Sequence, residues 1–189
     1  MYKEILNFWF DEISPSQWWS NDYDFDQKIR DRFSEVHARA TRCELYEWRK
    51  VAEGRLAEII ILDQFSRNIF RDLPLSYAYD PLALALAQTA ISVGADLELS
   101  TPEQRSFLYI PFMHSESWEN HKIAIDLYEK NGIKENTEAE KAHKKIIEMF
   151  GRYPHRNKIL GRASTKEEFE FLKPQACEFY ETLELHIAM

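Results

Sequence analysis

Residues 80–94 read DPLALALAQTAISVG, and this stretch indicates a helical fold. Asp80 is a residue type that caps helices, and Pro81 suits the first helical position because no partner is needed there for its missing N–H. Gly94 is typical of the residue just beyond a helix end. The segment between them is apolar on nearly every side and rich in alanine. We therefore expect a helix that is buried at close range between its neighbours.

Similar start signals recur along the chain. Thr101-Pro102 and the pattern Thr165-x-x-Glu168 predict the starts of two further helices. Both starts rest on a side-chain oxygen that can accept a hydrogen bond from a free backbone N–H. These positions and Asp80-Pro81 are the helix boundaries that the sequence predicts most directly.

Hydrophobic periodicity points the same way in other segments. Apolar residues recur at spacings of three and four over residues 24–40 and 137–150, which predicts amphipathic helices. Residues 58–62 contain three consecutive isoleucines and could form a buried strand. No other segment offers a partner strand, so we predict a buried helix there as well.

The composition agrees with a helical domain. The chain has 189 residues, and its 5 glycines and 7 prolines are few for the turns of an all-β fold of this size. Length and the lack of a linker predict one all-α domain over residues 1–189. The uneven spacing of the helix starts favours irregular antiparallel helix pairs over identical repeats. Residues 174–189 are expected to form a C-terminal helix or tail.

Charge and cysteine content exclude several classes of protein. The net charge of -8 disfavours binding to nucleic acid or to an anionic membrane, where affinity comes from a positive surface. Cys43 and Cys177 lack the spacing of a zinc site, so we expect reduced, partly buried thiols. The N-terminus lacks the layout of a secretory signal. The sequence predicts a soluble cytoplasmic protein without a cofactor or metal.

Polar residues follow the most apolar run of the chain in the segment DQFSRNIFR, residues 63–71. A buried helix that ends in this segment would carry Arg67 and Asn68 to the edge of the core. These side chains could bind a ligand. Alternatively, Asp63 and the arginines could form buried ion pairs that fix the helix end, since a buried arginine is usually paired.

The segment YIPFMHSE, residues 109–116, contains a proline within a helical pattern, so the helix should kink or stop near Pro111. His114 would then project from an irregular turn and could exchange a proton with a ligand, with Glu116 orienting it. His121 follows seven positions later, but the three residues match no known metal motif. A structural histidine is the alternative for His114.

The segment FGRYPHRNKILGR, residues 150–162, contains no acidic residue. Two glycines and a proline shape it as a loop in which guanidinium groups could surround an anion. The candidate ligand-binding residues here are Arg152, Arg156 and Asn157, and His155 is a further candidate acid or base. A basic loop that is neutralised by acidic residues elsewhere is the alternative.

Three segments match a family pattern in the right order: LDQFSRNIFR (62–71), FLYIPFMHSE (107–116) and FGRYPHRNKILGRASTKEE (150–168). With the N-terminal NFWF, the chain resembles the bacterial domain of unknown function 924 over about residues 5–173. The resemblance implies an all-helical domain, similar to irregular tetratricopeptide repeats, without an established activity. The chain has Ser66 where the family usually has proline, and Asn120-His121 where the family usually has Asp-Gln.

Two functions remain open at this level. The first is a pocket for a small anionic ligand, with a phosphate or carboxylate, and possible catalysis there. It requires five residues to converge: Arg67, Asn68, His114, Arg156 and Asn157. Asp63 and Glu116 would be the internal counter-charges. The second is a protein- or peptide-binding module with a concave helical surface, in which Trp18-Trp19 supply aromatic anchors.

Overall fold

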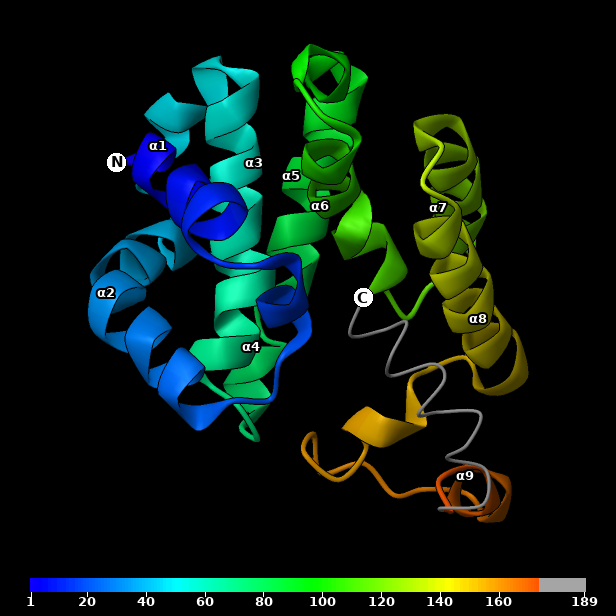
Figure 1. The fold of residues 1–189 in the computed structure, drawn as a ribbon. Coiled ribbons are helices and arrows are strands. Elements are labelled where there is room, and N and C mark those ends of the chain that lie inside the picture. Colours follow the sequence, from blue (N-terminus) through cyan, green and yellow to red (C-terminus); the bar gives the residue numbers. More distant parts are fainter. Residues whose placement is uncertain (174–189) are drawn as a thin grey trace.

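The computed structural model describes residues 1–173, and this part of the chain contains helices and no strand (Figure 1). The all-α prediction is therefore confirmed for these residues. The expected C-terminal helix or tail at 174–189 and the thiol of Cys177 lie outside the described residues. None of the helices within residues 1–173 is long and apolar enough to cross a membrane.

Nine α-helices follow one another, with short 3-10 and π-helical turns between several of them. Their bounds are α1 Tyr2–Asn7, α2 Tyr23–Thr41, α3 Ala52–Ile60, α4 Ser66–Ile69, α5 Asp80–Ser92, α6 Pro102–Met113, α7 Trp118–Asn131, α8 Lys134–Phe150 and α9 Lys166–Phe171, all within residues 1–173. The segment with three isoleucines is helical, as predicted. It passes from α3 into a π-helical turn, Ile61–Phe65, which leads directly into α4.

The predicted helix starts are confirmed with one correction. The Thr101 hydroxyl accepts a hydrogen bond from the N–H of Gln104, and Thr165 and Glu168 form a complete capping box at the start of α9. Helix α5 does begin at Asp80, but Asp80 is its first residue and does not cap it. The carboxylate of Asp80 is instead used in a cluster of charged side chains described below.

The core forms where α3 packs against both α5 and α6. Helix α5 buries the three small side chains of Ala83, Ala87 and Ala90, while its leucines are only half-buried. Small residues on one face allow the backbones of neighbouring helices to approach closely. The expectation of close packing is therefore confirmed for this face, but α5 is not buried on every side.

The second half of the chain adds a helical hairpin to this core. Helices α7 and α8 pack against each other and α7 packs against α6, as Figure 1 shows. After α8 the chain turns at Gly151 into a short 3-10 helix, Pro154–Arg156, and continues to α9. Pro111 lies within the last turn of α6, which ends at Met113, so the helix stops close to the proline as expected.

Cys43 departs from expectation. Its thiol is free but exposed, whereas we expected a partly buried side chain. It follows the end of α2 in a left-handed backbone conformation with φ 58°.

Candidate functional site

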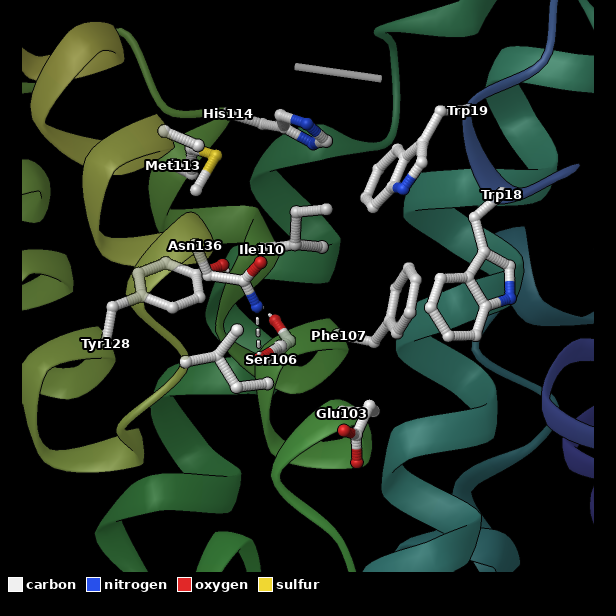
Figure 2. A pocket seen from close by; sticks show the side chains of 12 residues that line it. Trp18, Trp19, Glu103, Ser106, Phe107, Ile110, Met113, His114, Tyr128 and Asn136 are labelled. Atoms are coloured by element: carbon white, nitrogen blue, oxygen red, sulfur yellow. Dashed lines mark hydrogen bonds between the residues drawn. The ribbon is translucent and has the colours of Figure 1, made fainter. Parts of the chain in front are cut away.

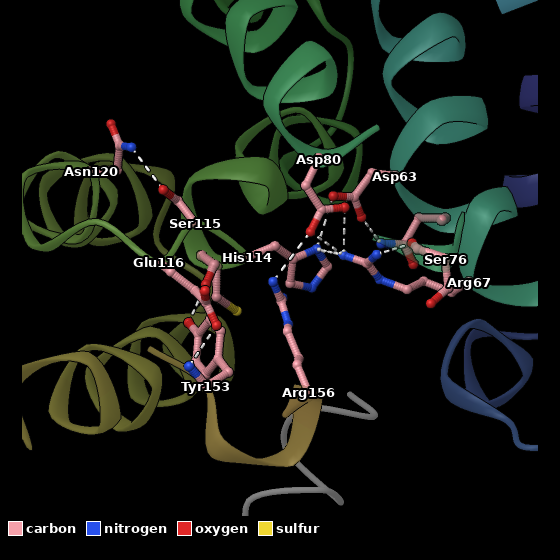
Figure 3. Close-up of polar contacts among 12 residues, drawn as sticks. Asp63, Arg67, Ser76, Asp80, His114, Ser115, Glu116, Asn120, Tyr153 and Arg156 are labelled. Carbon is pink, nitrogen blue, oxygen red and sulfur yellow. Dashed lines mark hydrogen bonds and ion pairs between the residues drawn. The ribbon is translucent and has the colours of Figure 1, made fainter. Parts of the chain in front are cut away.

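Three of the five residues that were expected to converge lie together (Figure 3). Arg67 comes from α4, His114 caps the C-terminal end of α6, and Arg156 ends the short 3-10 helix after α8. Two carboxylates complete the group, Asp63 and Asp80. We call these five side chains the Arg–His cluster.

Arg67 is held from several sides. One nitrogen of its guanidinium donates to the backbone carbonyl of Ser76, and another lies 2.9 Å from the carboxylate of Asp80. Its guanidinium carbon lies 4.6 Å from the ring centre of Tyr77. Burial acts to lower the pKa of Arg67, but the carboxylates of Asp80 and Asp63 raise it above its ordinary value. Arg67 therefore stays charged inside the cluster.

Arg156 is buried but much less completely paired. Its side chain is 7% exposed, and its hydrogen bond in the cluster is a long one of 3.3 Å to Asp80, which Arg67 also uses. The Nε of Arg156 is buried and has no hydrogen-bond partner among residues 1–173. The guanidinium lies against the rings of Tyr77 and Tyr153, at 4.7 and 4.6 Å. A buried donor without an acceptor is costly, so the hydrogen bonding of Arg156 is incompletely satisfied within the cluster.

The electrostatics of Arg156 agree with its geometry. Burial and the neighbouring charge of Arg67 lower the pKa of Arg156 below its ordinary value. Every other arginine within residues 1–173 whose pKa departs from its ordinary value has a raised one, because a carboxylate compensates it. Burial and a neighbouring like charge thus disfavour the charged form of Arg156, and Asp80 offsets them only in part.

Asp63 and His114 form a buried pair. The Nδ1 of His114 lies 2.8 Å from the carboxylate of Asp63, which is fully buried in the π-helical turn. Burial alone would raise the pKa of Asp63, but His114 and Arg67 lower it to about 2. The ionised carboxylate can only accept, so Nδ1 of His114 carries the hydrogen and donates it. Nε2 is left without a hydrogen bond to any described residue.

A cavity of about 160 Å³ lies beside this pair, and His114 forms part of its wall (Figure 2). The wall is mainly aromatic and aliphatic, and includes Trp18, Trp19, Phe107, Ile110, Met113 and Tyr128. Trp18 and Trp19 were proposed from the sequence as aromatic anchors for a bound peptide. Both pack against Phe107, at 5.0 and 5.7 Å between ring centres, and so help to close the cavity.

Asn68 and Asn157 do not join the cluster. Asn68 donates to the carboxylate of Asp26, which Arg71 also binds. Asn157 donates to Glu168, which Arg152 also binds. The two Arg-Asn dipeptides therefore act alike. The arginine of each points into the cluster, while the asparagine ties its segment to a buried carboxylate elsewhere.

The remaining candidate residues have structural partners. Arg152 forms an ion pair of 2.6 Å with Glu168, and holds the pKa of that carboxyl at about 2. Glu116 does not orient His114. It accepts hydrogen bonds from Arg162 and from the backbone N–H of Tyr153. His155 lies against the ring of Tyr153, with 5.4 Å between ring centres, and burial and the charge of Arg156 lower its pKa below its ordinary value. Most of the basic loop is thus neutralised by acidic residues from other segments.

The two histidines that were considered for a metal site, His114 and His121, each bond to a different carboxylate. His121 is fully buried and bonds to Glu140 at 2.6 Å, while His114 bonds to Asp63. Among residues 1–173, no group of three histidine, cysteine or acidic side chains is arranged to hold a metal ion.

Two residues, one in the cluster and one in contact with it, were not proposed for this site from the sequence. Asp80 was expected to cap a helix, and Tyr77 was not singled out. A signal for Asp80 existed in its position, since a carboxylate in the first turn of a helix is free to bind side chains when another group caps the helix. No local pattern marks Tyr77, whose ring both arginines contact.

The comparisons with known proteins identify the family. The model of the family described as bacterial protein of unknown function (DUF924) matches residues 5–176. The chain belongs to the DUF924 family. A solved structure from Agrobacterium tumefaciens, described as protein of unknown function ATU0120, is similar to this DUF924 chain. The two share 39% identity with a TM-score of 0.86 over 92% of this chain and 97% of the other. No curated protein matches the chain.

Proposed function

We propose that this DUF924 protein binds a small ligand that carries a phosphate or carboxylate group, with the anionic group at Arg156. The buried Nε of Arg156, which lacks a hydrogen-bond partner in the part of the chain that the structure describes, is the observation that carries the proposal. Arg67 adds a second guanidinium on the same carboxylate, Asp80. Two arginines that share one partner offer the forked donors that suit phosphate and carboxylate groups.

A role in proton transfer belongs to the same proposal. Asp63 fixes the hydrogen on Nδ1 of His114, and the free Nε2 is then a proton acceptor at the cavity. A histidine oriented by a buried carboxylate is a common arrangement in acid–base catalysis. His114 therefore stays the candidate acid or base, and Asp63 takes the place of Glu116 as the group that orients it.

The alternative is a protein- or peptide-binding module on a tetratricopeptide-like concave surface. Ligand pockets for drug-sized molecules measure about 300–1,000 Å³, whereas the cavity beside His114 measures about 160 Å³. Its size supports a small ligand over a peptide. Peptides screened in parallel with small anions keep the two functions distinguishable.

The test is a thermal-shift screen with inorganic phosphate, sulfate and small carboxylates. An anion at about one hundred times its Kd should stabilise folding by roughly 2.7 kcal/mol. For a chain of this length, that free energy raises Tm by about 5–10 °C. Arg156→Ala should remove the rise, because it removes the anion's donors.

Lys158→Ala is the matched control, since it removes the same charge two residues away at an exposed position. This variant should keep the full rise in Tm. A wild-type protein that responds to no anion, together with an Arg156→Ala variant destabilised by about 3–5 kcal/mol, would show that Arg156 is a structural ion-pair residue.

A further inference from the structure

The cavity beside His114 has a wall that offers little hydrogen bonding. Ser106 is the clearest example, because its hydroxyl donates to the carbonyl of Pro102 and accepts from Asn131 and Asn136. The hydroxyl therefore has no further hydrogen to donate to a ligand. The ring of Trp19 stacks on Phe107 with 15° between the ring planes, so its flat face contributes to an apolar wall. The interior therefore suits hydrocarbon.

The two ends of the cavity differ in charge. Figure 2 shows His114 at one end and Glu103 at the other, with the aromatic side chains between them. Arg67 lies beyond His114, with a guanidinium nitrogen 3.4 Å from its Nδ1. Near the His114 end the positive charges of Arg67 and Arg156 balance the carboxylates of Asp63 and Asp80, whereas the carboxylate of Glu103 repels an anionic group at the opposite end. The charges therefore favour one orientation of an acidic ligand in the cavity, with its acid group toward His114.

The volume limits the size of the apolar part. An apolar cavity of about 150 Å³ holds one benzene molecule, and this cavity measures about 160 Å³. One aromatic ring, or a chain of about five or six carbons, would fill it. A single carbon would leave it largely empty, and a second ring would not enter.

We infer that the ligand is an amphipathic monoacid, whose single ring or short alkyl chain fills the cavity while its acid group faces His114. The inference rests on the proposed function, because Arg156 and Arg67 must hold the acid group. It adds the chemical class of the ligand and its direction in the cavity. A diacid of the same length is excluded, since its second carboxylate would face Glu103.

Isothermal titration calorimetry with acetate, hexanoate and adipate tests this inference on the full chain. Each buried methylene should lower Kd by about fourfold. Hexanoate should therefore bind on the order of a hundredfold more tightly than acetate. Adipate has the same number of carbons as hexanoate and should lose most of that gain. Arg156→Ala should weaken the binding of acetate and of hexanoate alike.

Two substitutions address the cavity itself. Ala139→Leu places a larger side chain on the cavity wall. It should weaken the binding of hexanoate and leave the binding of acetate unchanged. Ala142→Leu is the control, on the same helix but away from the wall. Ile133→Phe, at a half-buried wall position, replaces Ala139→Leu if that variant fails to fold. Glu103→Gln, at an exposed position, should tighten adipate and leave hexanoate unchanged.

The outcomes separate this inference from the proposed function. If acetate and phosphate bind through Arg156 but hexanoate binds no more tightly than acetate, the alkyl chain does not enter the cavity and the inference is wrong. The anion site would then stand alone. If none of these anions binds, the proposed function itself fails.

Discussion

Asp80 determines how two buried arginines coexist in this protein. Its carboxylate lies 2.9 Å from Arg67 and 3.3 Å from Arg156, and both guanidinium groups also contact the ring of Tyr77. Two like charges in a buried cluster repel each other unless a negative group lies between them. The shared carboxylate is closer to Arg67, which also donates to the carbonyl of Ser76, and binds Arg156 only through a longer contact. That asymmetry is why Arg156 is the residue proposed to meet the ligand.

Asp80→Asn should therefore have two opposite effects. Without an anion the variant should lose about 3–5 kcal/mol, because a buried ion pair loses one partner. With phosphate it should recover part of that loss, so that phosphate raises Tm more than in the wild type. Urea denaturation with and without phosphate measures both effects.

Asp72→Asn is the matched control, because it removes the same charge from an exposed position in the same segment. Its stability and its response to phosphate should stay close to wild type. If phosphate raises the Tm of Asp80→Asn no more than that of the wild type, the arginines are not accessible to phosphate.

The helical elements depend on a few close contacts as well as on capping. Gly54 lies in α3, where an added Cβ would come within 2.1 Å of the backbone carbonyl oxygen of Trp48. The 3-10 helix Tyr46–Lys50 thus packs directly on the backbone of α3. This contact needs glycine for lack of space, since its φ does not lie in the left-handed region.

Gly54→Ala should be destabilising although alanine is the better helix former. At an unconstrained helix position, this change gains about 1 kcal/mol. Here overpacking against backbone should outweigh that gain, for a net loss of about 1–3 kcal/mol. Urea denaturation of the variant measures the loss.

Gly132→Ala offers a useful comparison at the end of α7. Gly132 has a φ of 85°, but open space surrounds the position where a Cβ would be. This variant should lose about 1 kcal/mol through backbone conformation alone. A Gly54→Ala variant that is more stable than wild type would show that α3 and the 3-10 helix are not in tight contact.

At the scale of the whole molecule, buried histidines make stability depend on pH. Burial lowers the pKa of His37 to about 4 and that of His143 to about 3. His37 bonds to the hydroxyl of Ser66. Because that hydroxyl donates to the carbonyl of Leu62, His37 must be the donor to Ser66.

We expect Tm to fall when the pH is lowered from 7 to 5. Both folded pKa values lie below the value of about 6.5 in the unfolded chain, so acid protonates the unfolded state first and favours it. Each histidine should cost roughly 2 kcal/mol at pH 5. His143→Gln should reduce the slope, and a Tm independent of pH over this range would contradict the prediction.

The carboxylates act in a lower pH window. The folded pKa of Asp63 and of Glu168 is about 2, below the value in the unfolded chain. Their stabilising contribution is complete above about pH 5 and is lost as the pH falls toward 2. Loss of stability between pH 7 and 5 therefore reports on the histidines and not on these two groups.

The sequence by itself determined the features that arise from neighbouring residues. Local hydrogen bonding and backbone geometry determine the helix starts at Thr101 and Thr165, the helical state of the isoleucine run and the end of α6 near Pro111. The placement of Arg67, His114 and Arg156 near the core edge also followed from their positions after apolar segments. Short-range signals are sufficient for these, because each depends on contacts within one or two helical turns.

Only the tertiary structure decided which charged groups meet. Asp80 pairs with Arg156 across 76 positions, and Glu116 pairs with Arg162 across 46. Asn68 and Asn157 resemble their neighbouring arginines in sequence, yet bind carboxylates outside the cluster. Ion-pair partners are chosen by the packing of helices far apart in the chain, and many acidic residues were equally available to each arginine. The cavity has the same origin, since its wall brings together the 3-10 helix at Pro15–Trp19 with α6, α7 and α8.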